Sequence, residues 1–436
     1  MQHSEEQIYA LAPDEASKKA GKGLASPSKW ITRGINEQAL WGECQGSGSK
    51  PYQTQVDLSS IAFKCSCPSR KFPCKHGLGL MLLNVQRPDL FTDPTVPAWV
   101  SDWISKRSEK EEKKVTRSDK PIDETAQTKR HEARTQKVSA GIQELQIWLK
   151  DIIRNGILAM PEKEDNYWDN MGRRMIDAQA PGLAAMVKTL GETKFWEDGW
   201  QSKFMDNLLK LFMVTESYQN LELVSPELRQ DILRTIGFTS SLEELKTQEG
   251  IKDTWLVLGK ETNAVGALTT EQNWLFGLQS QKYALILQFY SKGQPVELSL
   301  IPGTYFNAEL VFFPSAVPYR SLIKNQTGLT TALSNEFNGF ADWRELAMHE
   351  TKVTGLLPFH SDMPVVAQQL SPIKIQQEWW LKDQKGYLCK ISPAFKHLWK
   401  LLALSGGDPL TIAIIGKENN YLPIGVWHEN TYKPLS

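Results

Sequence analysis

The sequence predicts an α+β protein with several domains, and three observations support this fold class. A short segment near the N-terminus combines two strand-like stretches, a group of cysteines and an apolar helix. The middle of the chain carries apolar residues at helical spacing, whereas the second half consists of short apolar runs between Gly and Pro turns. At 436 residues the chain is long enough for about two to four domains with buried cores.

Residues 1–98 are predicted to form an N-terminal domain. Polar and apolar residues alternate from Tyr52 to Phe63, with Ser59-Ser60 in between, which predicts two short strands and a turn. From His76 the apolar residues recur at helical spacing until Arg87-Pro88. The order strand, strand, helix defines a small ββα unit at about 52–88.

The next two segments differ in composition. Residues 99–140 are rich in Lys, Arg, Glu, Ser and Thr and have few large apolar side chains, so they are predicted to be a charged linker, with an exposed helix in part of it. Residues 141–250 are predicted to be a helical domain, because apolar residues from Ile142 to Ile157, and again after Pro181, fall on one helical face.

Residues 251–436 are predicted to be a β-rich C-terminal region with one or two subdomains. Its apolar runs are short, for example 255–258, 283–290, 308–313 and 410–415, and turn residues separate them. A short helix is expected near 394–404, ended by Gly406-Gly407.

Three cysteines and a histidine predict a metal site. Cys65 and Cys67 form a Cys-x-Cys pair, and Cys74 and His76 follow after six residues as Cys-x-His. Three thiolates and one imidazole complete a closed tetrahedral site for one structural Zn²⁺. In an extended strand Cys65 and Cys67 would lie on the same side, and a loop with Pro68 and Pro73 would return Cys74 and His76 to the same ion.

Three alternatives to structural zinc remain at this point. The cysteines could be buried apolar residues beside an unrelated histidine. A catalytic zinc would keep one position open for water, which four protein ligands in a short loop do not favour. An iron–sulfur cluster would need another thiolate, and Cys44 is the one cysteine close by in the sequence.

Charge and hydropathy limit the function and the location of the chain. Fifty basic and fifty acidic residues cancel, so a uniformly cationic wrapper for nucleic acid is excluded. The N-terminal residues lack a basic stretch followed by an apolar one, and no run of about eighteen apolar residues occurs, so a cytoplasmic protein without a membrane span is expected. An odd number of cysteines, three of them clustered, also fits a reducing compartment.

The Cys-x-Cys and Cys-x-His pairs, with the helix that follows, resemble the SWIM zinc finger. Further similarity to bacterial SWIM zinc-finger proteins encoded beside MoxR-type AAA ATPases and von Willebrand factor A proteins lies in three segments: 41–48 (WGECQGSG), 177–183 (DAQAPGL) and 401–407 (LLALSGG). The resemblance implies zinc at Cys65, Cys67, Cys74 and His76 and a general role in binding DNA, RNA or protein. It also implies a MoxR-type ATPase and a von Willebrand A protein as partners, and it implies no defined enzymatic activity.

Basic residues surround the predicted metal site. No acidic residue occurs between Asp57 and Asp89, whereas Lys64, Arg70, Lys71 and Lys75 are basic and Phe72 offers an aromatic face. Such a patch could contact the phosphates and bases of nucleic acid. Alternatively, the charges solvate the loop and offset the negative charge of a three-thiolate site.

The sequence therefore predicts a zinc-binding, non-enzymatic adaptor that recognises nucleic acid or a protein through the finger. Motifs for NTP binding, dinucleotide binding, zinc proteases and serine hydrolases do not occur. Two alternatives stand beside it: a nucleic-acid-directed enzyme with an active site in the C-terminal half, and a purely structural finger in an interaction scaffold.

Overall fold

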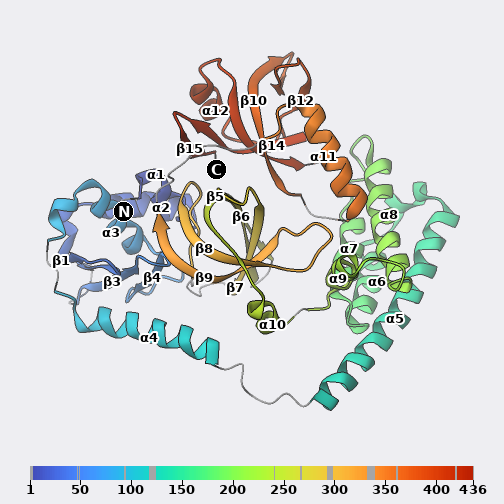
Figure 1. The fold of residues 1–436 in the computed structure, drawn as a ribbon, viewed down its shortest axis with the longest axis horizontal. Helices are drawn as coiled ribbons and strands as arrows, with labels where there is room; N and C mark the ends of the chain where they lie inside the picture. The colour runs from blue at the N-terminus through green and yellow to red at the C-terminus, as the bar shows by residue number, and fades with distance from the viewer. Residues whose placement is uncertain are drawn as a thin grey trace.

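The protein consists of four packed units, seen together in Figure 1. The computed structural model describes residues 3–46, 48, 50–92, 95–116, 124–239, 241–265, 268–291, 298–330, 339–359, 362–417 and 420–435. A β-barrel lies in the centre of the view, with the N-terminal domain on its left, the helical domain on its right and a C-terminal sheet above it. The predicted α+β class, with a helical segment and a β-rich C-terminal half, is confirmed.

The N-terminal domain is an antiparallel four-stranded sheet, in the order β1-β2-β3-β4, covered by helices. Its elements are α1 (Glu5–Tyr9), α2 (Glu15–Leu24), the 3₁₀ turn Pro27–Lys29, β1 (Trp30–Ile35), β2 (Ala39–Cys44), β3 (Tyr52–Asp57), β4 (Ala62–Cys65), α3 (Lys75–Gln86) and the 3₁₀ turn Pro88–Leu90. The predicted two strands and helix correspond to β3, β4 and α3.

Helix α3 is buried on nearly all sides, because it packs against the sheet and also against α1 and α2. Gly21 of α2 and Gly79 of α3 make the contact between the two helices close. A Cβ at Gly21 would lie 2.8 Å from the Cβ of Leu78, and one at Gly79 would lie 2.7 Å from the Cβ of Leu24. Helix α2 is therefore part of the same core as the ββα unit.

The segment predicted as a charged linker is helical wherever the structure describes it. Helix α4 (Ala98–Thr116) follows the N-terminal domain, and α5 (Glu124–Asn155) leads into the helical domain. Near its start, α4 buries Val100 against Ala39 and Trp41 of β2. Glu-, Lys- and Arg-rich sequence supports an exposed helix as readily as a linker, because these residues favour helix and solubility alike.

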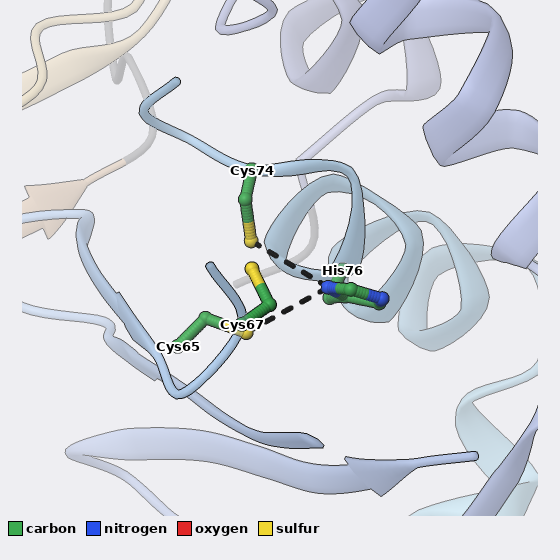
Figure 2. Close-up of side chains that lie close together, drawn as sticks. All are labelled: Cys65, Cys67, Cys74 and His76. Carbon is green, nitrogen blue, oxygen red and sulfur yellow. Dashed lines mark hydrogen bonds between the residues drawn. The ribbon is translucent and has the colours of Figure 1, made fainter. Parts of the chain in front are cut away.

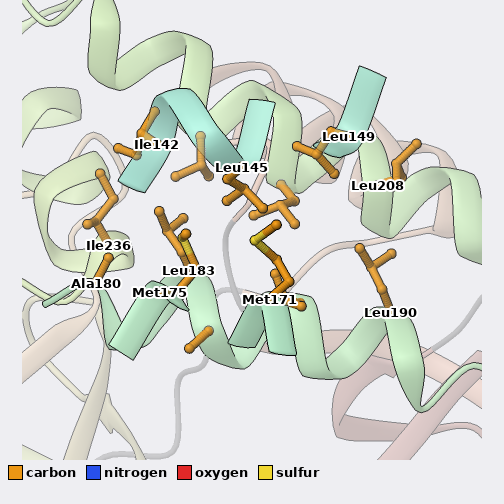
Figure 3. Packing of buried hydrophobic residues seen from close by; sticks show 14 of the residues in the cluster. Ile142, Leu145, Leu149, Met171, Met175, Ala180, Leu183, Leu190, Leu208 and Ile236 are labelled. Carbon is orange, nitrogen blue, oxygen red and sulfur yellow. The ribbon is translucent and has the colours of Figure 1, made fainter. Parts of the chain in front are cut away.

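The helical domain contains α5, the 3₁₀ helix Ile157–Glu162, α6 (Asp165–Asp177), α7 (Pro181–Gly191), α8 (Trp200–Gln219), α9 (Pro226–Ile236) and the short α10 (Leu242–Thr247). Apolar residues at helical spacing meet in one continuous core, part of which Figure 3 shows. From α5 these are Val138, Ile142, Leu145, Leu149 and Ile152. The N-terminal part of α5 thus belongs to the bundle, upstream of the predicted start at 141.

The centre of the protein is a closed barrel of five strands in the order β5-β6-β7-β9-β8. The strands are β5 (Ile251–Val265), β6 (Leu268–Gly277), β7 (Tyr283–Ser291), β8 (Tyr305–Phe312) and β9 (Arg320–Thr330). All neighbours pair antiparallel except β7 and β9, which pair parallel. A five-stranded barrel with Greek-key connections is the architecture of OB folds.

The C-terminal unit is an antiparallel sheet in the order β12-β11-β10-β13-β14-β15 with two helices. Its elements are α11 (Trp343–Leu356), β10 (Pro364–Ile375), β11 (Glu378–Lys382), β12 (Leu388–Lys390), α12 (Leu398–Ser405), β13 (Leu410–Lys417), β14 (Asn420–His428) and β15 (Thr431–Pro434). Helix α12 corresponds to the helix expected near 394–404. The described part of the C-terminal half thus comprises a barrel and a sheet.

The sheet covers the outer face of the barrel. Leu256 and Leu258 of β5 and Trp274 and Phe276 of β6 form a buried cluster with side chains of β10, β13 and β14. The Tyr432 hydroxyl donates a hydrogen bond to the Leu258 carbonyl oxygen across this contact, at 2.6 Å. OB folds bind ligands on the face of their second and third strands, here β6 and β7, and this cluster covers the part of that face formed by Trp274, Phe276 and Leu285.

The N-terminal domain is attached to the barrel by the segment before β8. Ile301 is buried in the core of the N-terminal domain, and the Ser299 amide donates to the Ser60 carbonyl oxygen at 3.0 Å. Among the helices that the structure describes, none has an apolar stretch of the length that crossing a membrane requires.

Candidate metal centre

The two ends of one loop bring the four predicted ligands together, as Figure 2 shows. Cys65 is the last residue of β4, Cys67 lies two residues further on, Cys74 is the N-cap of α3, and His76 lies in the first turn of that helix. All four ligand atoms lie within 4.8 Å of one another. The prediction of one Zn²⁺ held by these residues is confirmed.

The strand does not continue through the Cys-x-Cys pair as predicted. β4 ends at Cys65, and the Ser66 amide makes one more hydrogen bond, to the Gln53 carbonyl oxygen at 3.0 Å. Cys67 then lies in the turn that follows. Pro68 comes next in the chain and has no backbone N–H, so it cannot extend the ladder.

The distances fit a tetrahedral zinc ion. The His76 Nδ1 atom lies 3.7 Å from Cys65 Sγ and 4.0 Å from Cys74 Sγ. Zn–S bonds of about 2.3 Å and Zn–N bonds of about 2.0 Å place neighbouring sulfur and nitrogen ligands about 3.6 Å apart in a tetrahedron. Small movements of the side chains are therefore enough to close the site on the ion.

The core of the domain fixes the position of the ligands. Cys74 and His76 are almost fully buried, whereas Cys65 and Cys67 are partly exposed. The ring of Tyr52 packs against the imidazole of His76, with the centroids 4.9 Å apart. The buried hydroxyl of Thr54 lies 3.2 Å from Cys65 Sγ, where it can donate to a thiolate.

The three sulfurs also shift one another's ionisation. Hydrogen bonds from Cys65 and Cys74 lower the pKa of the Cys67 thiol. Donation to Cys67 raises the pKa of Cys65, and hydrogen bonds to the other two sulfurs raise the pKa of Cys74. A bound Zn²⁺ would stabilise all three thiolates and release their protons.

Cys44, the possible fifth ligand, is not part of this cluster. It is fully buried at the end of β2, and burial raises the pKa of its thiol. Its sulfur lies 3.7 Å from the Gln45 carbonyl oxygen. The Cys₃His set therefore fits zinc better than an iron–sulfur cluster with four thiolates.

The basic residues predicted around the finger have different environments. Lys64, Arg70 and Lys75 are exposed. Lys71 is exposed but forms an ion pair with Asp14, the N-cap of α2, at 2.6 Å, and the hydrogen bond from Lys71 lowers the pKa of Asp14 to about 2. Phe72 is half-buried, so only part of its ring is open for stacking.

A cavity of about 590 Å³ lies directly beside the zinc ligands. The finger contributes Cys67, His76 and both Lys71 and Lys75 to its wall, and α2 closes the opposite side. Sequence reasoning did not identify this cavity or the contribution of α2. The apolar residues of α2 indicate that this helix packs against another element. Nothing in the sequence links the helix to a loop about fifty residues later.

The comparisons with known proteins agree with the site and the bundle. A model of the SWIM zinc finger matches residues 52–84, and a model of the SWIM-associated four-helix bundle domain matches residues 133–236. No curated protein and no solved structure matches the chain. The chain therefore contains a SWIM zinc finger followed by a SWIM-associated four-helix bundle domain.

Proposed function

We propose that this protein is a non-enzymatic adaptor that binds nucleic acid through its zinc finger. The observation that carries the proposal is the position of three exposed cations, Lys64, Arg70 and Lys75, on or beside the loop that the metal fixes. Among the described residues none of the three forms an ion pair. Their charges are therefore available to phosphates.

The geometry supports modest, zinc-dependent binding. Three phosphate contacts give a slope of log K against log salt of about −2 for single strands and about −3 for duplex DNA. Zinc matters because it holds Cys65 and Cys74 together, and with them the ends of the loop that carries Arg70. Loss of the ion should release the loop and disperse the charges.

The carboxylates that line a cavity in the C-terminal half support a non-enzymatic role. Asp253 accepts hydrogen bonds from the backbone amides of Gln279 and Ser280, and so holds a turn of the barrel. Glu309 forms an ion pair with Lys324 at 3.1 Å and accepts from the Gly250 amide. Both groups are engaged in local structure, whereas a general base needs access to a substrate proton.

Protein binding is the second candidate, and the helical domain favours it. Trp196 and Leu223, in the connections on either side of α8, are 82% and 83% exposed, and Leu158 is 74% exposed. Trp196 is the candidate anchor for a partner, because tryptophan is enriched among the residues that carry most of the binding energy of protein interfaces. In this proposal the adaptor works in the reducing cytoplasm, and the resemblance to SWIM proteins suggests a MoxR-type ATPase and a von Willebrand A protein as partners.

The test is binding of zinc-loaded protein to labelled single- and double-stranded DNA and RNA over a salt series. The triple variant Lys64→Gln/Arg70→Gln/Lys75→Gln should lose most of the binding and its salt dependence while keeping its zinc. The control removes three exposed lysines of the helical domain, as Lys150→Gln/Lys210→Gln/Lys246→Gln, and should bind like the wild type. Equal binding by both triple variants, or none by the wild type at low salt, would contradict the proposal and favour a protein ligand.

A further inference from the structure

The cavity beside the finger has the features of a ligand site in its own right. Its volume of about 590 Å³ is within the range of about 300–1,000 Å³ that is usual for small-ligand pockets. It lies between helix α2 on one side and the metal-binding loop on the other. One wall is formed by zinc ligands themselves, Cys67 and His76.

The wall combines an apolar part with a basic rim. Ala16, Ala20, Leu24, Tyr52 and Pro68 supply apolar surface. This is a surface for a flat, weakly polar group, and an aromatic ring such as Tyr52 offers it an edge or a face.

The rim carries two lysines. Lys71 and Lys75 both line the cavity. Lys71 is paired with Asp14, which leaves Lys75 as the exposed lysine of the rim without an ion pair among the described residues.

The charge of the metal site decides how a ligand would be oriented. Three thiolates and Zn²⁺ together carry a net charge of about −1. A phosphate would be repelled from the Cys67 side of the wall and attracted to the lysines at the rim. A neutral base inside and phosphates outside satisfy both parts of the cavity, whereas a free inorganic phosphate satisfies only the rim.

We propose that this cavity binds one unstacked nucleotide of a single-stranded nucleic acid, with the base inside and a flanking phosphate on Lys75. This inference rests on the proposed nucleic-acid binding and adds the form of nucleic acid that is recognised. A base within a duplex is stacked and paired, and extracting it costs a few kcal/mol, so the cavity selects single strands.

The experiment fills the cavity without changing its charge. Ala16 is an exposed residue of α2 whose side chain lines the cavity, so Ala16→Phe should block the space while α2 stays folded. The matched control is Lys19→Phe, which places the same ring on an exposed position of the same helix outside the lining. The control also loses a positive charge, so a purely electrostatic mechanism would weaken it more than Ala16→Phe.

The affinities are measured with labelled short single strands and with the duplex of the same sequence, alongside zinc content and thermal unfolding. We expect the wild type and Lys19→Phe to prefer single strands, and Ala16→Phe to lose about tenfold on single strands with no change on duplex. If all three proteins bind single strands equally, the cavity proposal fails while the proposed function stands. If the wild type binds no nucleic acid, both fail, and binding of polyglutamate that is sensitive to Ala16→Phe would assign the cavity to an acidic protein.

Discussion

Arg107 of helix α4 donates a hydrogen bond to the carboxylate of Asp57 at the end of β3, with Nε and Oδ2 3.0 Å apart. The same guanidinium donates to the Ser60 hydroxyl at 2.9 Å and lies over the ring of Trp103. Through the 57–60 turn, α4 is thus tied to the zinc finger. The barrel contacts the same turn, because Gln326 donates to the Ser59 carbonyl oxygen.

We expect Arg107→Met to detach α4 from the finger. Both side chains are largely buried, so Asp57 would be left without its counter-charge, at a cost of about 2 kcal/mol. Hydrogen exchange of the α4 amides measures this as a lower local opening free energy. Arg107→Lys keeps the charge, so its opening free energy for α4 should fall between those of the wild type and Arg107→Met. Wild-type protection in Arg107→Met would show that the pair does not hold α4.

The same contact should depend on pH. Burial acts to raise the pKa of Asp57, but hydrogen bonds from Ser59 and Ser60 and the charge of Arg107 outweigh it, so the pKa in the folded protein is lowered. Because the folded pKa is lowered, the ionised Asp57 carboxylate contributes its full stability above the unfolded pKa of about 3.9. This stability is lost as the pH falls through the lower folded pKa. The difference in the opening free energy of α4 between the wild type and Arg107→Met should therefore shrink only in acid.

Cys74→Ser should remove the zinc, since a hydroxyl is a poor replacement for a thiolate ligand. The finger would unfold locally, because much of its stability comes from the metal, while the helical domain has its own core and should persist. Metal analysis and the helical signal in circular dichroism measure the two effects. Cys44→Ala is the matched control: it removes a buried cysteine of the same domain and should keep one zinc per chain, and its loss of zinc would add Cys44 to the ligand set.

The hydroxyl of Thr54 should tune zinc affinity through Cys65. Thr54→Val removes the hydrogen bond to the sulfur and keeps the shape of the side chain, so we expect affinity for zinc to fall about 10–100-fold. Competition with a chelator of known affinity gives the value. Thr32→Val on β1 removes an exposed hydroxyl bonded to Glu43 and should leave the affinity unchanged. Equal affinities for all three proteins would mean that Thr54 does not act on the site.

The metal ligands could be predicted because they are close in sequence and their spacing reflects local geometry. Helix α2 and the cavity could not, because Gly21 and Gly79 join α2 to α3 by a close approach that leaves no periodic pattern. In the same way, the apolar run at 283–290 predicted a strand, but not the parallel pairing of β7 with β9 that closes the barrel. Contacts of this kind depend on distant partners, which periodicity within one segment does not encode.

Helical spacing also predicted slightly too wide a face on α5. The predicted face from Ile142 to Ile157 includes Ile152 and Ile153, yet Ile152 is buried and Ile153 is 50% exposed. Adjacent residues on a helix differ by about 100° in direction, and here Ile152 points into the core while Ile153 lies at the exposed edge of the face. The bundle is thus predictable as a set of helices, but its packing is settled by contacts such as the one between α7 and α9.

Gly182 makes that contact possible, because a Cβ at this position of α7 would lie 1.8 Å from the carbonyl oxygen of Thr235 in α9. The obstacle is backbone, so Gly182→Ala must push the two helices apart, and we expect a loss of about 2–3 kcal/mol. Hydrogen exchange of the α7 and α9 amides should show the loss as weaker protection of both helices.

Gly172 of α6 is the matched control, since a Cβ there would come no closer than 4.0 Å to the Ala184 carbonyl oxygen. Gly172→Ala should raise stability by about 0.5–1 kcal/mol, because alanine loses less backbone entropy in a helix. Opposite signs for the same substitution in neighbouring helices would tie the effect to the α7–α9 contact. Destabilisation of equal size in both variants would instead mean that the bundle does not tolerate alanine at either glycine, and the close approach would not be the cause.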